Sequence, residues 1–211
     1  MSKLDGLRWR LSTIVARPLL RCRGIQVGSR VRFDGLPIVT GSEFGAISIG
    51  DGVELTGCSR GTALGVRSRV ILRLMCPGAR LSIGAETALS GTVICSAISV
   101  EIGERVLIGA DVLIFDTDFH NLEPESRHAP PDWARISKRV VIEDDVFIGA
   151  RSIVMKGVSI GKGAIIGAGS VVTADVPPFM TAAGSPVRIL GSVPRGHDRE
   201  SLVGLLNRVK P

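Results

Sequence analysis

The stretch IEDDVFIGARSIVMKGVSIGKGAIIGAGSVV, residues 142–172, repeats one pattern with a period of six. An aliphatic residue opens each hexad, and a second small or apolar residue follows four positions later. A helix repeats every 3.6 residues and a strand every two, so neither alone explains this period. A short strand plus a turn, stacked coil upon coil, does explain it, and this is the hexapeptide β-helix pattern. The aliphatic positions are Ile142, Ile148, Val154, Ile160, Ile166 and Val172, and the second positions are Val146, Ser152, Val158, Ala164 and Ser170.

The rhythm extends upstream of this stretch. Ile102, Ile108 and Ile114 keep the same spacing, and weaker turns occur at 27–33 and 49–55. The pattern predicts an all-β prism over residues 25–190, in which inward aliphatic side chains stack on those of neighbouring coils and glycine eases the turns. A second block, one residue out of phase with the first, runs from Ile83 through Leu89 to Cys95.

Composition agrees with a core built from aliphatic rather than aromatic side chains. The 211 residues are 45% hydrophobic but only 4% aromatic, and 26 are glycine. No apolar run is long enough for a membrane span, and the first residues lack the apolar centre of a signal peptide. Four cysteines without a CxxC motif predict free thiols in a reducing cytoplasm, which is the expected location. They are Cys22, Cys58, Cys76 and Cys95.

The two ends of the chain differ from the repeats. Residues 1–24 have helical apolar spacing and hold most of the basic excess, since residues 1–32 contain eight Lys or Arg and one acid. This segment predicts a helix that caps the open first coil. A second interpretation is peripheral contact with acidic lipid headgroups. No nucleic-acid-binding motif accompanies the charge, so nucleic acid is not an expected partner. Residues 191–211 predict an extended exit and a short amphipathic helix from about Asp198.

Residues 116–139 interrupt the hexads with three prolines, mixed charge and a histidine. An insertion of this length is too long for a turn between strands, and long loops on regular scaffolds usually carry function. The loop begins DTDFHNLEPESR, which places His120 between hexads on both sides.

These features together resemble the hexapeptide-repeat acetyltransferases, and most specifically over residues 100–190. The motifs that carry the resemblance are the hexads, the histidine loop and the closing segment IIGAGSVVTADVPPFMTAAGSPVRIL, residues 165–190. The branch most similar contains the maltose, galactoside and nodulation O-acetyltransferases and the sugar acyltransferases of polysaccharide synthesis. The resemblance implies a left-handed parallel β-helix, a homotrimer, acetyl-coenzyme A as donor, and active sites between adjacent subunits.

By the same resemblance, His120 is the general base that removes a proton from the acceptor hydroxyl. A neutral imidazole suits this role because its unperturbed pKa is about 6.5. Asp116 and Asp118 are the two candidates for orienting the imidazole. Asn121 replaces a proline found in several relatives and is a candidate acceptor contact. His128 is expected to be an ordinary surface histidine, and His197 receives no role.

The donor site is also inferred from the resemblance. The Ala150 N–H is expected to contact the thioester oxygen, as an oxyanion-hole donor does. Phe147 would line the same cleft, and Ala168 and Thr173 would border the pantetheine and adenine. Ordinary hexad packing explains Ala168 and Thr173 equally well. Arg188, Lys156 and Lys162 are candidates for phosphate contacts.

The expected reaction is O-acetylation of a sugar hydroxyl in surface polysaccharide assembly. Galactoside-type relatives hold the acceptor with an asparagine where this chain has Leu89 or Ser90. Ser90 is therefore a candidate acceptor contact, and a simple galactoside acceptor is disfavoured. An N-acetyltransferase of a nucleotide-linked amino sugar and a non-catalytic β-helix scaffold are the alternatives. No metal is expected, because the chain lacks the His-x4-His spacing of the β-helical carbonic anhydrases.

Overall fold

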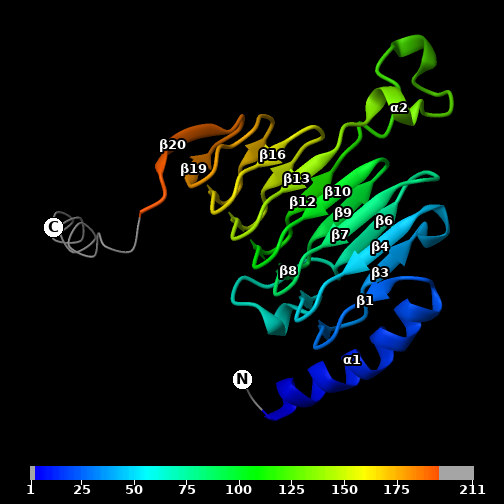
Figure 1. Ribbon diagram of the computed structural model, residues 1–211, viewed down its shortest axis with the longest axis vertical. Coiled ribbons are helices and arrows are strands. Elements are labelled where there is room, and N and C mark those ends of the chain that lie inside the picture. The colour runs from blue at the N-terminus through cyan, green and yellow to red at the C-terminus, as the bar shows by residue number, and fades with distance from the viewer. Residues whose placement is uncertain (1–2, 195–211) are drawn as a thin grey trace, which may run out of the picture.

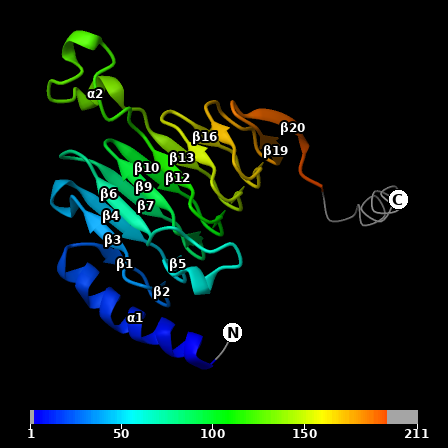
Figure 2. The ribbon, with the colours of Figure 1, turned by 180° about the vertical axis from the view of Figure 1, so that it is seen from behind.

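The computed structural model describes residues 3–194, and within them the chain winds repeatedly through three parallel sheets (Figures 1 and 2). From β1 to β18 each coil gives one short strand to each sheet, so hydrogen-bonded neighbours among these strands are three apart in chain order. This confirms the parallel β-helix predicted from the hexads.

The three sheets are named A, B and C in the order in which each coil visits them. Sheet A contains β1 (Gln26–Val27), β4 (Ala46–Ile49), β7 (Arg80–Ile83), β10 (Ser99–Ile102), β13 (Val140–Ile142) and β16 (Ser159–Ile160). Sheet B contains β2 (Arg32–Asp34), β5 (Glu54–Thr56), β8 (Ala88–Ser90), β11 (Leu107–Ile108), β14 (Phe147–Ile148), β17 (Ile165–Ile166), β19 (Met180–Ala183) and β20 (Arg188–Ser192). Sheet C contains β3 (Ile38–Thr40), β6 (Ile71–Leu74), β9 (Val93–Ser96), β12 (Leu113–Phe115), β15 (Ile153–Val154) and β18 (Val171–Val172).

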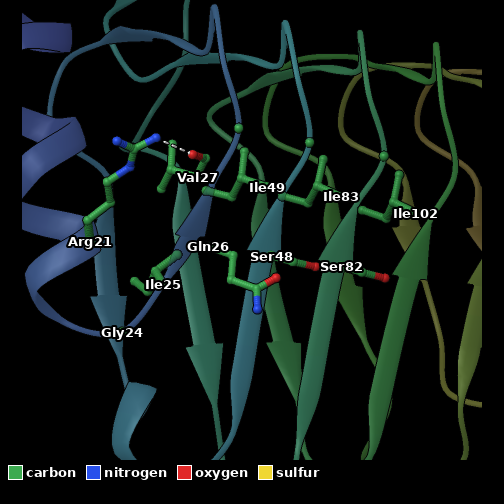
Figure 3. A pocket seen from close by; sticks show the side chains of 13 residues that line it. Arg21, Gly24, Ile25, Gln26, Val27, Ser48, Ile49, Ser82, Ile83 and Ile102 are labelled. Carbon is green, nitrogen blue, oxygen red and sulfur yellow. Dashed lines mark hydrogen bonds between the residues drawn. The ribbon is translucent and has the colours of Figure 1, made fainter.

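The core is the interior of the prism. All the aliphatic and second hexad positions predicted between Ile142 and Val172 are buried, so this part of the prediction is confirmed. Figure 3 shows the stacking in sheet A, where Val27, Ile49, Ile83 and Ile102 form one row. Each coil buries only a few methyl groups, and stacking on the next coil completes their burial.

The expected hexad at Cys95 is wrong by one residue. Ile94 is the fully buried residue and is paired with Leu72 and Ile114, which are also buried. The spacing from Leu89 to the next buried residue, Ile94, is therefore five residues, one fewer than in a hexad. Gly91 lies in the turn between them with φ +57, a left-handed conformation that glycine adopts at little cost. The next spacing, from Ile94 to Ile102, is eight residues, two longer than a hexad. The two changes together displace the later hexads by one residue, which is the change of phase seen in the sequence.

Helix α1 (Lys3–Cys22) lies across the first coil at one end of the stack (Figure 1). Ala16 and Leu20 are buried against the prism, and the Thr13 hydroxyl accepts a hydrogen bond of 3.0 Å from the Phe33 N–H. The apolar stripe seen in the sequence is not the contact face. Its described members, Leu11, Ile14, Val15 and Leu19, are exposed.

The inserted loop 116–139 leaves the prism between β12 and β13 and projects from it in both views (Figures 1 and 2). It contains η3 (Pro124–Ser126) and α2 (Trp133–Ile136). The sequence predicts only this insertion, but residues 57–70 form a second, shorter one that contains η2 (Ser59–Gly61). A further short helix, η1 (Ser42–Phe44), follows β3.

At the other end of the stack, β19 continues sheet B and β20 pairs with it in the antiparallel direction. The extended exit predicted near residue 190 agrees with β20. The short helix predicted from Asp198 lies outside the described residues. No helix among residues 3–194 has the length and apolar character that crossing a membrane requires.

The outward faces of the three sheets differ in chemistry. Sheet A presents a mainly polar row: Gln26, Ser48, Ser82, Glu101, Val141 and Ser159. Sheet B changes along the stack from charged to apolar, in the row Arg32, Glu54, Ala88, Leu107, Phe147 and Ile165. Sheet C presents an unbroken aliphatic row, which is Ile38, Ile71, Val93, Leu113, Ile153 and Val171.

Candidate functional site

The loop 116–139 is closed at its neck by backbone hydrogen bonds. Thr117 and Ser137 form an antiparallel bridge, and the Lys138 N–H donates to the Asp116 carbonyl at 2.8 Å. The neck therefore holds the two ends of the loop together at one edge of the prism, the edge between sheets C and A.

Asp116 anchors this neck to the prism. Its carboxylate is fully buried and accepts hydrogen bonds from the backbone N–H groups of residues 97–99, at 2.6–2.8 Å, and from the Ser96 hydroxyl at 3.0 Å. These four bonds use the carboxylate to cap the turn between β9 and β10. We therefore assign Asp116 to the prism wall rather than to the orientation of His120.

Asp118 is held at the base of the loop by Lys156. The Lys156 ammonium forms an ion pair with the Asp118 carboxylate and donates to the Ile136 carbonyl at 2.9 Å. Both side chains are about one-fifth exposed. Lys156 thus ties both ends of the loop to the turn after β15, a task that competes with the phosphate contact expected of it.

His120 lies on the outside of this anchored loop, and its side chain is exposed. The preceding residue, Phe119, has φ +66, a left-handed conformation that is costly for an aromatic residue. The Phe119 ring packs against Phe115 with a centroid separation of 5.4 Å. This contact fixes the reversal of the chain that turns His120 outward.

Asn121 fills the interior of the loop. Its amide nitrogen donates to the carbonyls of Ser126 and Pro130, at 3.0 and 3.1 Å, and its carbonyl oxygen accepts from the Asp132 N–H at 2.9 Å. The side chain is buried. Asn121 therefore maintains the shape of the loop, with both polar atoms of its amide engaged inside it.

A different edge, between sheets B and C, holds the expected donor-side residues. Phe147 projects from sheet B and is 45% exposed. Ala150 and Ala168 follow in successive coils, so close that a Cβ on Gly149 would approach the Ala168 nitrogen to 2.4 Å. The N–H groups flanking Ala150 donate to Ile166 and Ala110, whereas within residues 3–194 the Ala150 N–H donates to none. A free N–H next to an exposed aromatic ring is suited to polarise a carbonyl oxygen.

The remaining predicted residues are spread around the prism. Thr173 is exposed at the edge between sheets C and A, whereas Lys162 lies at the edge between A and B, 3.8 Å from an Asp145 oxygen. Arg188 is exposed on β20. Ser90 ends β8, two coils before Phe147 on the same sheet.

One prism therefore does not gather all the predicted residues. Phe147, Ala150 and Ala168 lie toward the edge between B and C, and the His120 loop leaves from the edge between C and A. Sheet C, with its aliphatic outward row, separates the two edges.

A hollow of about 760 Å³ lies on sheet A beside the end of α1 (Figure 3). Gln26, Ser48 and Ser82 form its polar row, and the Arg21 guanidinium donates to the Val27 carbonyl at 2.7 Å. Arg21 is the one ionisable side chain in its lining, so the hollow offers no acid–base pair. Across the described part of the chain, no three His, Cys, Asp or Glu side chains gather in a way suited to a metal ion.

The hexads match a family model described as the hexapeptide repeat of succinyl-transferase, over residues 139–174. A galactoside O-acetyltransferase from Lactococcus lactis is 42% identical over 88 residues, which cover 42% of this chain and 41% of that protein. A 2,3,4,5-tetrahydropyridine-2,6-dicarboxylate N-acetyltransferase from Staphylococcus aureus is 35% identical over 108 residues, 51% of this chain and 39% of that protein. The chain thus spans about two-fifths of the length of these curated relatives.

Solved structures share the fold over most of the chain. The N-acyltransferase AntD from Bacillus cereus, in complex with dTDP and 3-hydroxybutyryl-CoA, has a TM-score of 0.64 at 19% identity and is matched over 92% of this chain and 97% of its own. A hexapeptide-repeat-containing acetyltransferase from Vibrio cholerae, complexed with acetyl-coenzyme A, has a TM-score of 0.53 at 24% identity, over 85% of this chain and 77% of its own.

The fold is thus the left-handed parallel β-helix that the resemblance implies. Residues 139–174 match the hexapeptide repeat of that family model, and about half of the chain or less is similar in sequence to the two acetyltransferases named above.

Sequence reasoning missed the aliphatic outward row of sheet C, although the sequence contains a signal for it. In each hexad the residue immediately before the buried aliphatic points outward. That position holds Ile153 and Val171 in sheet C, Phe147 and Ile165 in sheet B, and Ser159 in sheet A. Comparing these outward residues separately for each sheet would have identified the apolar face.

Proposed function

We propose that the protein transfers an acetyl group from acetyl-coenzyme A to a sugar hydroxyl, with His120 as general base. The observation that carries the proposal is His120, exposed on a loop that Asp116 and Lys156 anchor to a hexapeptide prism. An anchored loop presents one imidazole in a fixed place while leaving it accessible to a substrate.

In the proposed step, the neutral imidazole of His120 removes the proton from the acceptor hydroxyl. The oxygen attacks the thioester carbon, the C–S bond breaks, and the coenzyme leaves as a thiolate that takes up a proton. The products are the acetyl ester and the free thiol of coenzyme A. The Ala150 N–H would stabilise the negative charge on the carbonyl oxygen during the attack.

We further propose that the active unit is a homotrimer with each site shared by two subunits. The outward row of sheet C would bury its aliphatic side chains around the three-fold axis. Sheet C is bounded by the edge with the His120 loop and the edge with Ala150. Turning this sheet toward the axis therefore brings the loop edge of one subunit to the donor edge of the next.

The position of Asp118 bears on how His120 is oriented. Asp116 is poorly suited to this role, because its carboxylate is fully buried and already accepts hydrogen bonds from three backbone N–H groups of the turn between β9 and β10. Asp118 keeps one oxygen beyond its pair with Lys156 and lies two residues from His120. We therefore favour Asp118 as the orienting carboxylate.

The acceptor class and the setting are part of the proposal. We propose a glycan precursor of surface polysaccharide, modified in the cytoplasm. The four thiols of Cys22, Cys58, Cys76 and Cys95 are all free in the structure, which suits a reducing compartment. A relative that acetylates galactosides supports a sugar hydroxyl as acceptor.

N-acylation is the second candidate, because both the Staphylococcus aureus relative and AntD are named as N-acyltransferases. A parallel assay separates the two. The protein is incubated with acetyl-coenzyme A and matched panels of hydroxyl and amino sugars, and thiol release and product mass are followed. Hydroxylamine removes an O-acetyl ester but leaves an amide intact. Absence of coenzyme binding, thiol release and acetylated product with every acceptor would instead support the scaffold interpretation.

A further inference from the structure

Helix α1 has two faces, and the prism covers only one of them. Leu11, Ile14, Val15 and Leu19 are 56, 69, 52 and 44% exposed. At 100° per residue these four side chains fall on one side of the helix, opposite Ala16 and Leu20, which are buried. We name these four residues the outer stripe. An apolar stripe on a helix that is already packed on its other face calls for a second contact.

Basic residues flank the outer stripe. Arg10, Arg17 and Arg21 are spaced by seven and four residues, so they lie along one side of the helix next to Ile14. The first 32 residues carry eight basic side chains and one acid, whereas the rest of the chain is close to neutral. The positive charge of the protein is therefore concentrated in the segment of sequence that contains this stripe.

A groove of about 460 Å³ connects the stripe to the prism. Trp9 and Ile14 give it an apolar wall, and Arg10, Arg17, Arg30 and Arg32 also line it. The Arg32 guanidinium lies 5.5 Å from the centroid of a Trp9 ring and pairs with Glu54.

Arg17 joins the helix to the prism inside this groove. Its Nη2 donates to the Gly28 carbonyl at 2.5 Å, while its Nε is buried and has no partner among the described residues. Because the Nε is buried, Arg17 contributes to anion binding through the positive charge of its guanidinium rather than through this N–H.

We propose that α1 docks the prism on an anionic lipid surface, with the outer stripe at the acyl boundary and phosphate groups at the arginines. The combination of an apolar stripe and flanking arginines is what binding in the plane of a membrane interface requires. A second copy of the chain fits this face less well, because two arginine-rich faces repel each other. The proposal is independent of the acetyl-transfer site.

The test is co-sedimentation of the full chain with phosphatidylcholine vesicles that contain about 30% phosphatidylglycerol, compared with pure phosphatidylcholine vesicles. We expect binding to the anionic vesicles at about 0.1 M salt and release near 1 M, where the Debye length falls to about 3 Å. Ile14→Asp/Val15→Asp should weaken binding at least about tenfold, because it places two charges in the stripe. Arg10→Gln/Arg21→Gln should weaken it roughly tenfold, since each basic residue near an anionic surface strengthens binding several-fold.

Two matched controls lie elsewhere on the prism. Leu64→Asp changes an apolar residue that is 71% exposed, and Arg60→Gln/Arg69→Gln removes two exposed charges, both in the insertion 57–70. Both controls should bind like the wild type. Light scattering and circular dichroism of every variant establish that fold and subunit number are unchanged.

Three results in these experiments would overturn the proposal, and a fourth comes from competition. These are no binding to anionic vesicles at low salt, equal losses in stripe and control variants, or a change of subunit number in Ile14→Asp/Val15→Asp. Competition by soluble glycerophosphate, with no requirement for the stripe, would also overturn it, because the groove would then bind a free anion rather than a surface.

Discussion

The proposed chemistry depends on His120, whose side chain is exposed on a loop that Asp116 and Lys156 anchor to the prism. His120→Ala removes the proton acceptor without touching the prism core. General-base contributions are typically about 10²–10⁴-fold, so we expect kcat for acetyl transfer to fall by that order. Thiol release from acetyl-coenzyme A measures it. His128→Ala, in the same loop and also exposed, is the matched control and should keep the wild-type rate.

The pH dependence offers a second readout of the same residue. Only neutral imidazole accepts the proton, so kcat/KM should rise with pH through a single ionisation. The rise should be absent from the residual activity of His120→Ala. If this variant keeps both the rate and the pH profile of the wild type, another group is the base.

We expect the asparagine variants of Asp116 and Asp118 to differ in their effects on stability and on kcat. In Asp116→Asn an amide nitrogen faces backbone N–H donors in a buried place, so we expect a loss of roughly 3 kcal/mol in the free energy of unfolding. Thermal unfolding measures this loss. Asp175→Asn is the control, because Asp175 is exposed and accepts one hydrogen bond, from the Ser159 N–H at 2.7 Å. We expect little loss there.

Asp118→Asn should also cost some thermal stability, because it removes the partner of a largely buried Lys156 ammonium. It should in addition lower kcat, because Asp118 is placed to orient the imidazole. The loss should be smaller than in His120→Ala. A Asp118→Asn protein with wild-type kcat and pH profile would restrict Asp118 to holding the loop through Lys156.

At the scale of elements, the loop is stabilised by an exposed ion pair as well as by its neck. The Arg135 guanidinium, hydrogen-bonded to Glu123, lowers the pKa of that carboxyl to about 2 from its ordinary 4.5. A group whose pKa is lowered by folding contributes stability that is fully present above its ordinary pKa and is lost as pH falls through the lowered value. This contribution is therefore lost between about pH 4.5 and 2.

We expect pepsin to cleave the loop increasingly as the pH falls through this window, and Glu123→Gln to remove part of the pH dependence. Glu125→Gln, two residues away and also exposed, is the control and should behave like the wild type. Equal changes in the two variants would mean that the pair with Arg135 does not stabilise the loop.

The elements also indicate how far sequence reasoning reaches. The inward positions follow from the period, because a buried row needs an aliphatic residue in every coil. The five-residue spacing from Leu89 to Ile94 was not predictable, because only the pairing of Ile94 with its neighbours distinguishes it from Cys95. The contact face of α1 was missed because Thr13 and Ser12 bind it through hydrogen bonds to the prism, which an apolar pattern does not reveal.

The candidate site was predicted in part for a similar reason. Motifs locate His120 and the donor edge, since these follow from position in the repeat. They do not separate a carboxylate that orients an imidazole from one that caps a turn. Asp116 and Asn121 are polar residues in the inserted loop, yet both are buried and hydrogen-bonded to other groups of the same chain.

At the scale of the whole molecule, the aliphatic row of sheet C predicts the assembly. We expect a trimer by light scattering at micromolar concentration. Leu113→Asp/Ile153→Asp places charges in this row and should yield monomers. Ser82→Asp/Ser159→Asp adds the same two charges to the polar row of sheet A, and this variant should remain trimeric. A monomeric wild type, or equal disruption by both pairs, would contradict the role of sheet C.

If each site is shared by two subunits, mixing two inactive variants should restore activity. His120→Ala spoils the loop edge, and Ala168→Glu, at an exposed position on the donor edge, should repel the phosphates of the coenzyme. Each variant alone should be nearly inactive. Mixed trimers refolded from equal amounts of the two variants should regain about one-quarter of wild-type activity. In random assembly about half of the loops and about half of the donor edges are intact, so about one-quarter of the shared sites combine an intact loop with an intact donor edge. Loops and donor edges that act within one subunit would give no recovery on mixing.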